Sequence, residues 1–115
     1  MRRIKRVYDE PDRDDGYRIL VDRLWPRGLS KEKAKVDLWM KEVAPSNVLR
    51  KWFSHDPMKW DDFKKKYEME LNDKDNLMKR IVQMEEEHGT ITLLYSAKEE
   101  EHNNAVALDG FLRRQ

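Results

Sequence analysis

One segment limits the possible folds of this chain more than any other: residues 19–28, which read ILVDRLWPRG. Ile19 to Val21 is a short apolar run with β-branched side chains, typical of a strand that is covered on both faces. The segment turns polar at Asp22, and Pro26 ends it because proline has no N–H for a strand ladder. We therefore predict a buried strand from about Tyr17 to Leu24 that delivers an acid, two arginines and an indole to one end of a sheet.

Two further strands complete the predicted sheet. Residues 3–8 form a short strand whose charged side chains favour an edge position, and residues 90–95 form an apolar strand. The loop at 9–16 is too short for a parallel crossover, so the first two strands are either antiparallel neighbours or not adjacent. The long helical stretch before the last strand makes that strand a parallel partner of the central one. Their exit loops, residues 25–28 and 96–98, should then lie side by side.

Apolar residues recur at helical spacing between the central strand and the last one. We expect five helices, at about residues 30–43, 46–53, 57–71, 77–88 and from about 99 to near the end. Ser30 and Ser46 are candidate N-caps of the first two, and Val48 is expected on the apolar face of the second. The chain is therefore predicted to be a single α/β domain spanning residues 1–115. Its small mixed or parallel sheet of about three strands should be packed with about five helices.

The composition argues against several classes of function. Lys+Arg 24 against Asp+Glu 23 gives a net charge of +1, so no overall field favours nucleic acid or an anionic membrane. The absence of cysteine removes disulfides, thiolate nucleophiles and cysteine-based zinc sites. No apolar run approaches the ~20 residues that span a bilayer, and the charged N-terminal residues lack the apolar segment of a signal peptide. We therefore expect a cytoplasmic protein without a membrane partner.

The first candidate site follows the central strand. Within six positions it contains four side chains suited to binding: Asp22, Arg23, Trp25 and Arg27. A surface that only contacts solvent does not need so many such residues after a buried strand. Arginine offers a planar fork for a carboxylate or phosphate, and tryptophan offers a flat surface for stacking, so these residues predict an anion or nucleotide pocket. A structural alternative stays open, in which Asp22 pairs with an arginine and Trp25 packs under the helices.

The second candidate site follows the last strand. The site consists of polar residues in or near the loop before the last helix, where free backbone N–H groups can bind an anion: Ser96, Lys98, His102, Asn103 and Asn104. The three glutamates at 99–101 would repel a phosphate, so His102 and Asn103 are interpreted as groups that orient a hydroxyl or amide of a substrate. The structural alternative is a well-capped helix with exposed polar residues.

Catalysis has limited support in the sequence. Ser96 stands where rhodanese and low-molecular-weight cysteine phosphatase loops carry a thiolate, and a serine there removes that chemistry. The catalytic candidates are His102, as the natural proton carrier, with Lys98 and Ser96; whether the protein is an enzyme stays open. The His55-Asp56 pair and the Glu85-x-x-His88 step lack the further ligands of a metal site. We predict neither a metal nor a cofactor.

Several stretches that together cover nearly the whole chain carry a family resemblance: 5–8 (KRVY), 15–18 (DGYR), 20–28 (LVDRLWPRG), 44–51, 63–71, 93–98 (LLYSAK), and His102-Asn103 with Ala105. Through them the chain resembles the YeaO-like family of small prokaryotic proteins, a branch of a large family of unknown function. The resemblance implies a single α/β domain with no established activity. Some members carry a transcription-regulator label, but this chain has no helix pair followed by the hairpin of a winged helix. The family's recurrent polar positions match Asp22, Arg23, Arg27, Ser96, Lys98, His102 and Asn103.

The favoured hypothesis is a pocket for a small anionic or nucleotide-like ligand, with or without catalysis, at the carboxyl edge of the sheet. Arg23 and Arg27 would bind the anionic group, and Trp25 would stack on the ligand. The alternative is a non-enzymatic module that binds a protein or nucleic-acid partner through a surface around Arg50 and Trp52. Nucleic acid is the less favoured partner because a typical nucleic-acid binder is more basic than this chain. The oligomeric state stays open.

Overall fold

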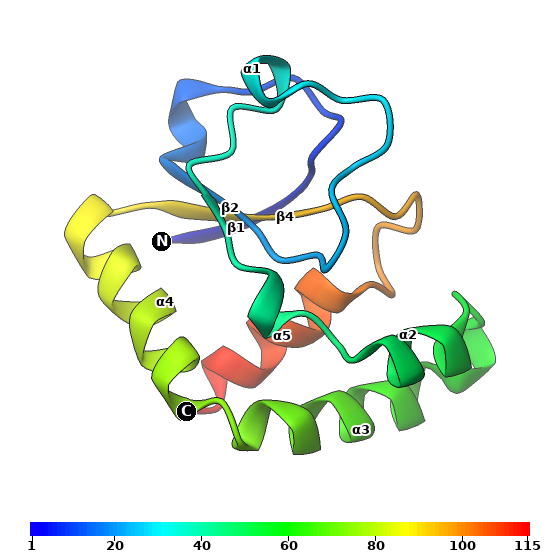
Figure 1. Ribbon diagram of the computed structural model, residues 1–115. Coiled ribbons are helices and arrows are strands. Elements are labelled where there is room, and N and C mark those ends of the chain that lie inside the picture. The colour runs from blue at the N-terminus through cyan, green and yellow to red at the C-terminus, as the bar shows by residue number, and fades with distance from the viewer.

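The computed structural model describes residues 1–115 and contains one sheet of four parallel strands (Figure 1). The strands are β1 (Arg2–Arg6), β2 (Tyr17–Leu20), β3 (Leu38–Trp39) and β4 (Ile91–Tyr95), in the spatial order β1-β4-β2-β3. The helices are α1 (Lys31–Ala34), α2 (Asn47–Phe53), α3 (Trp60–Asn72), α4 (Asp75–His88) and α5 (Asn104–Arg113), with short 3-10 turns at Arg13–Asp15, Lys41–Val43 and Pro57–Lys59. The predicted α/β domain is confirmed, and none of its helices is long and apolar enough to cross a bilayer.

The central pair of strands is the one that the sequence predicts. β2 and β4 run parallel, with Ile19 opposite Leu93 and Leu20 opposite Leu94. β1 lies on the other side of β4, so β1 and β2 are not adjacent, which is one of the two predicted arrangements. The polar segments that follow β2 and β4 therefore leave the sheet at the same edge.

Both faces of the central strands are covered, which explains their continuous apolar sequences. On one face, Ile19 and Leu93 lie in a large core with residues of α2, α3, α4 and α5. On the other face, Leu20 and Leu94 pack against Ala34 of α1 in a smaller core. Figure 1 shows this division, with α1 on one side of the sheet and the other helices on the opposite side.

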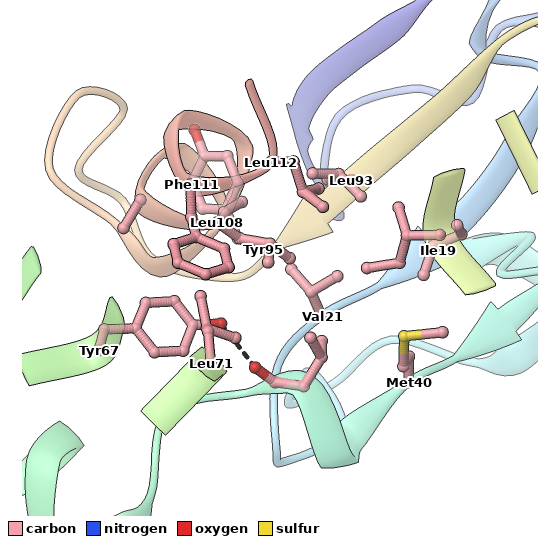
Figure 2. Packing of buried hydrophobic residues seen from close by; sticks show 14 of the residues in the cluster. Ile19, Val21, Met40, Tyr67, Leu71, Leu93, Tyr95, Leu108, Phe111 and Leu112 are labelled. Carbon is pink, nitrogen blue, oxygen red and sulfur yellow. Dashed lines mark hydrogen bonds between the residues drawn. The ribbon is translucent and has the colours of Figure 1, made fainter. Parts of the chain in front are cut away.

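Tyr67 of α3 joins the large core to the segment that precedes α2. Its side chain is fully buried near Leu71, and its hydroxyl donates a 2.6 Å hydrogen bond to the backbone carbonyl of Val43 (Figure 2). Burial raises the pKa of the Tyr67 hydroxyl far above its usual value, so this group stays a neutral donor. The bond helps to fix the segment that forms one wall of the site described below.

The predicted helix at 30–43 is wrong beyond its first turn. Ser30 caps a helix as expected, but α1 ends where Lys35 adopts a left-handed conformation with a φ of 48°. β3 forms instead, and the Met40 amide donates to the Leu20 carbonyl at 2.8 Å. The open edge of β2 offers unpaired backbone groups to this segment, and pairing with them outweighs the helical spacing of its apolar residues.

Three smaller expectations also need correction. The central strand ends at Leu20, short of its predicted end. Val48 is 80% exposed, because the buried stripe of the seven-residue α2 lies on its other side. The last helix begins at Asn104 rather than near Glu99, because Asn103 is its N-cap and the Glu99 carboxylate accepts two amides of the preceding turn.

Candidate functional site

The loops that follow β2 and β4 lie side by side and are joined by the carboxylate of Asp22. Its Oδ2 accepts hydrogen bonds from the Ser96 amide at 2.9 Å and from the Ser96 hydroxyl at 2.7 Å. Its Oδ1 accepts from the side-chain amide of Asn104 at 3.0 Å, and the same nitrogen donates to the Val21 carbonyl at 3.0 Å. Asp22 therefore connects the exit of β2 to the exit of β4 and to the first turn of α5.

A cavity of about 340 Å³ opens at this edge of the sheet. Three of its polar lining residues, Asp22, Ser96 and Asn104, are held together by the hydrogen bonds above, and this cluster is called the polar end of the cavity below. Its apolar lining includes Leu24, Trp25, Pro26, Pro45, Phe53 and Phe63. This volume and this mixture of apolar walls with a few polar groups are typical of a small-molecule site.

Cationic side chains dominate the charge of the cavity. Arg23, Arg27 and Arg50 line it, whereas Asp22 is the only carboxylate among the lining residues, so the formal charge of the lining is +2 with His55 neutral. Arg27 and Arg50 are exposed, and neither guanidinium forms a hydrogen bond or ion pair within the protein. Both groups are therefore available to a ligand.

Arg23 is the guanidinium that the fold holds in place. Its Nε donates to the Pro45 carbonyl at 3.3 Å, and its Nη2 donates to the Ala44 carbonyl at 3.1 Å. Both acceptors are neutral, so neither cancels the charge of Arg23, and three of the five N–H groups of its guanidinium remain. Lys74 also reaches the Ala44 carbonyl at 3.4 Å. Burial lowers the pKa of Lys74, and the charge of Arg23 lowers it further against the opposing charge of Glu70.

Trp25 is held by contacts within the protein, whereas the stacking hypothesis requires only a ring surface that a ligand can reach. Its Nε1 donates to the Leu29 carbonyl at 2.7 Å, and its ring meets the Trp39 ring at a centroid distance of 5.5 Å and an interplanar angle of 69°. The side chain packs against the smaller core and also lines the cavity. Trp25 therefore contributes a wall whose position the protein fixes.

Lys98 and His102 are not among the lining residues of the cavity. Lys98 is exposed, and His102 Nδ1 lies 3.1 Å from the Glu99 carboxylate, with its ring 5.0 Å from the Trp60 ring. The amides of His102 and Glu101 donate to the Glu99 carboxylate and lower its pKa. Glu99, Glu101 and His102 therefore belong to a turn before α5.

Asn103 lines the cavity, but the helix cap uses its polar atoms. Its Oδ1 accepts from the Val106 amide at 3.0 Å, and its Nδ2 donates to the Glu99 carbonyl at 2.9 Å. The side chain is only 2% exposed. Asn103 thus positions α5 against the cavity.

Asn104 lines the cavity as a member of the second candidate site, whereas Arg50 and His55 line it without having been predicted in a pocket. Arg50 belongs to α2 and His55 follows it, and no local pattern predicts that this part of the chain lines the same cavity as the residues after β2. Nowhere in the chain do three or more His, Asp or Glu side chains lie close enough together to hold a metal ion.

The comparison with known proteins shows the family to which this chain belongs. The family model described as the inactive DUF488-N3 subclade matches residues 1–115. The chain belongs to this family. The uncharacterized protein YeaO of Escherichia coli (strain K12) is 44% identical over 109 residues, which cover 95% of this chain and 94% of that relative. The predicted membership of the YeaO-like family is therefore confirmed.

A mycobacterial relative matches a shorter stretch. The uncharacterized protein Rv3073c of Mycobacterium tuberculosis (strain ATCC 25618 / H37Rv) is 49% identical over 71 residues, 62% of this chain and 60% of the relative. No solved structure matches the chain.

Replacing Ser96 tests how much its hydroxyl supports the site of this DUF488-N3 protein. Ser96→Ala removes the 2.7 Å bond to Asp22 but keeps the 2.9 Å bond from the backbone amide. We expect the free energy of unfolding in urea to fall by about 1 kcal/mol. The control is Ser54→Ala, an exposed serine, with an expected change within about 0.5 kcal/mol. Equal changes in the free energy of unfolding for the two variants would show that the Ser96 hydroxyl does not stabilise the site.

Proposed function

We propose that this protein binds a small organic anion in the cavity at the carboxyl edge of its sheet. The observation that carries the proposal is Arg23, which lines the cavity while two neutral carbonyls hold its guanidinium in place. A charge that is held before the ligand arrives loses little conformational freedom on binding. Arg27 and Arg50 add two unpaired guanidinium groups, whose planar forks suit a carboxylate or phosphate.

Binding without catalysis fits the positions of the candidate catalytic groups. A serine nucleophile needs a base that takes its proton, yet the Ser96 hydroxyl donates to Asp22, whose carboxylate already accepts two other hydrogen bonds. His102 does not line the cavity and pairs with Glu99. The description of the family as inactive points the same way.

A second cavity differs from the proposed site in the charge of its lining residues. It has a volume of about 400 Å³ and lies along α4 near the end of the chain. Its charged lining residues are Asp75, Lys79 and Glu86, which give it a negative balance. An anion is therefore favoured in the cavity with the three arginines and disfavoured in this one.

The alternative function, an interaction module, draws on the surface around Trp52. The ring of Trp52 is half-buried and flanked by the ammonium groups of Lys59 at 5.0 Å and Lys66 at 5.1 Å. These cations already occupy the ring, so a base would have to displace them in order to stack there. Binding to single-stranded oligonucleotides that falls steeply with salt would favour this function over the first.

The proposed function is tested by a thermal-shift screen of carboxylates, sugar phosphates and nucleotides. A ligand at a hundred times its dissociation constant adds about 2.7 kcal/mol, which raises the melting temperature by several degrees. We expect one class of anion to produce this shift in the wild type and in Arg80→Ala, and Arg27→Ala to reduce it without changing the fold. Arg80 is the matched control, because it is exposed on α4 and does not line the cavity.

Two results would count against anion binding. A screen in which no small anion shifts the wild type would favour the interaction module. A shift that Arg80→Ala and Arg27→Ala reduce equally would point to a general charge effect instead of a site.

A further inference from the structure

At the polar end of the cavity, the side-chain hydrogen-bond donors are already engaged within the protein. The Ser96 hydroxyl donates its proton to Asp22 at 2.7 Å. The side-chain amide of Asn104 directs its nitrogen to two acceptors, Asp22 and the Val21 carbonyl, each at 3.0 Å, so both of its N–H groups are taken. The carboxylate of Asp22 has no proton to donate. These three lining side chains therefore offer a ligand no further donor.

The same three side chains keep the capacity to accept hydrogen bonds. A carboxylate has about four lone-pair positions, and Asp22 uses three of them. The Oδ1 of Asn104 accepts no hydrogen bond from the protein, and the Ser96 hydroxyl oxygen still has lone pairs. This end of the cavity therefore suits a ligand group that donates protons.

The charges of the lining residues determine where an anionic group and a proton-donating group of a ligand are favoured. Asp22 repels an anionic group at the polar end, whereas the guanidinium groups of Arg23, Arg27 and Arg50 attract one. Apolar side chains, including Phe53 and Phe63, complete the lining and suit a flat ring. A ligand with only an anionic group would leave the acceptors of the polar end without partners, which is costly once water is displaced.

We propose that the ligand carries an amino group in addition to its anionic group, on a flat apolar body. The anionic group binds the arginines, and the two N–H groups of the amino group donate to acceptors among Asp22, Ser96 and Asn104. This inference rests on the proposed function and names the chemical class of the ligand, an amino-substituted aromatic acid. The inference of an amino group follows because every side-chain donor at the polar end is engaged within the protein. The charge of the arginines alone would predict only the anionic group.

The test compares three probes of similar size by isothermal titration calorimetry on the whole protein. They are 4-aminobenzoate, 4-methylbenzoate, which has no polar group at that position, and 4-methoxybenzoate, which can only accept a hydrogen bond there. We expect 4-aminobenzoate to bind roughly tenfold more tightly than either of the others, the effect of one or two added hydrogen bonds.

Two variants separate the roles of the two groups. Arg23→Gln should weaken the binding of all three probes and keep the ratio between them. Asp22→Asn should reduce the preference for 4-aminobenzoate to within about twofold, because it replaces an acceptor-only group with one that also donates. Asp22 also joins the two loops, so Asp22→Asn could fail to fold. In that case the relative affinities of the three probes for the wild type test the amino-group inference.

The outcomes distinguish the inference from the function on which it rests. Equal affinities for the three probes that all depend on Arg23 would overturn the amino-group inference and leave anion binding standing. A failure of all three probes to bind would count against both. A tenfold preference for 4-aminobenzoate that Asp22→Asn abolishes would support the inference.

Discussion

Replacing Gly16 by alanine is expected to destabilise the protein by about 3 kcal/mol or more. Gly16 has a φ of 63° and a ψ of −135°, a conformation that side chains with a Cβ rarely adopt. An added Cβ would lie 2.1 Å from the Thr90 carbonyl oxygen and 2.8 Å from its carbon, both backbone atoms. The Tyr17 amide donates to that same carbonyl at 3.0 Å, where β2 begins to pair with β4. Relief of the clash would therefore disturb the start of the central strand pair.

Gly28→Ala is the matched control for this prediction. Gly28 also has a positive φ, 76°, but an added Cβ meets no atom within 4 Å. It should cost only the backbone strain of a left-handed residue, about 1–2 kcal/mol. Urea denaturation of both variants measures the difference, and equal losses would mean that the contact with Thr90 is unimportant.

The second large effect is expected for Asp15→Ala, with a loss of about 3–5 kcal/mol in the free energy of unfolding. Asp15 is fully buried and forms ion pairs with Arg18, with Lys5 at 3.1 Å and with Arg3 at 3.1 Å. Arg18 is only 3% exposed, so the variant leaves a buried guanidinium without its carboxylate. Asp14→Ala, at the exposed neighbouring position, is the control, with an expected change below about 0.5 kcal/mol.

The pH dependence of this effect has a definite sign. Burial alone would raise the pKa of Asp15, but the Asp12 amide and the cations of Lys5 and Arg18 outweigh burial and hold the pKa below its usual value. A carboxyl with a lowered pKa in the folded state contributes stability above its unfolded pKa of about 3.9 and loses it as the pH falls through the folded value. The difference between the wild type and Asp15→Ala should thus be full at pH 7 and shrink below about pH 4. A difference that is the same at pH 7 and in acid would contradict this account of Asp15.

The sequence predicts the centre of the fold well because that information is local. The apolar run at Ile19 to Val21 and the one at 91–95 identify the two buried strands, and the chain length between them predicts their parallel pairing. From that pairing follows the contact between Asp22 and Ser96, although only the structure gives its geometry.

Features that depend on contacts distant in sequence are not predicted. Trp39 belongs to an apolar pattern with helical spacing, yet residues 38–39 form β3 because the edge of β2 lies beside them. Arg50 of α2 lines the same cavity as the residues that follow β2, and the carbonyls of Ala44 and Pro45, just before α2, accept hydrogen bonds from Arg23. Such positions require the packed chain, which no short pattern encodes.

The predicted site residues divide according to their partners in the folded chain. Asp22, Arg23, Trp25 and Arg27 line one cavity with Ser96 and Asn103, whereas Lys98 and His102 do not. His102 binds the Glu99 carboxylate in a turn whose amides are turned back on that carboxylate. A sequence pattern lists polar residues near a sheet edge, but it does not reveal which of them are already satisfied by neighbours.

The central claim, that the cavity binds an anion through Arg23, is tested most directly by an NMR titration of ¹⁵N-labelled protein with benzoate. We predict saturable shifts of backbone amides in residues 22–27, 44–55 and 96–104 of the wild type, and none in a folded Arg23→Gln. Shifts confined to α4 and the end of the chain, or shifts that persist unchanged in Arg23→Gln, would contradict the claim.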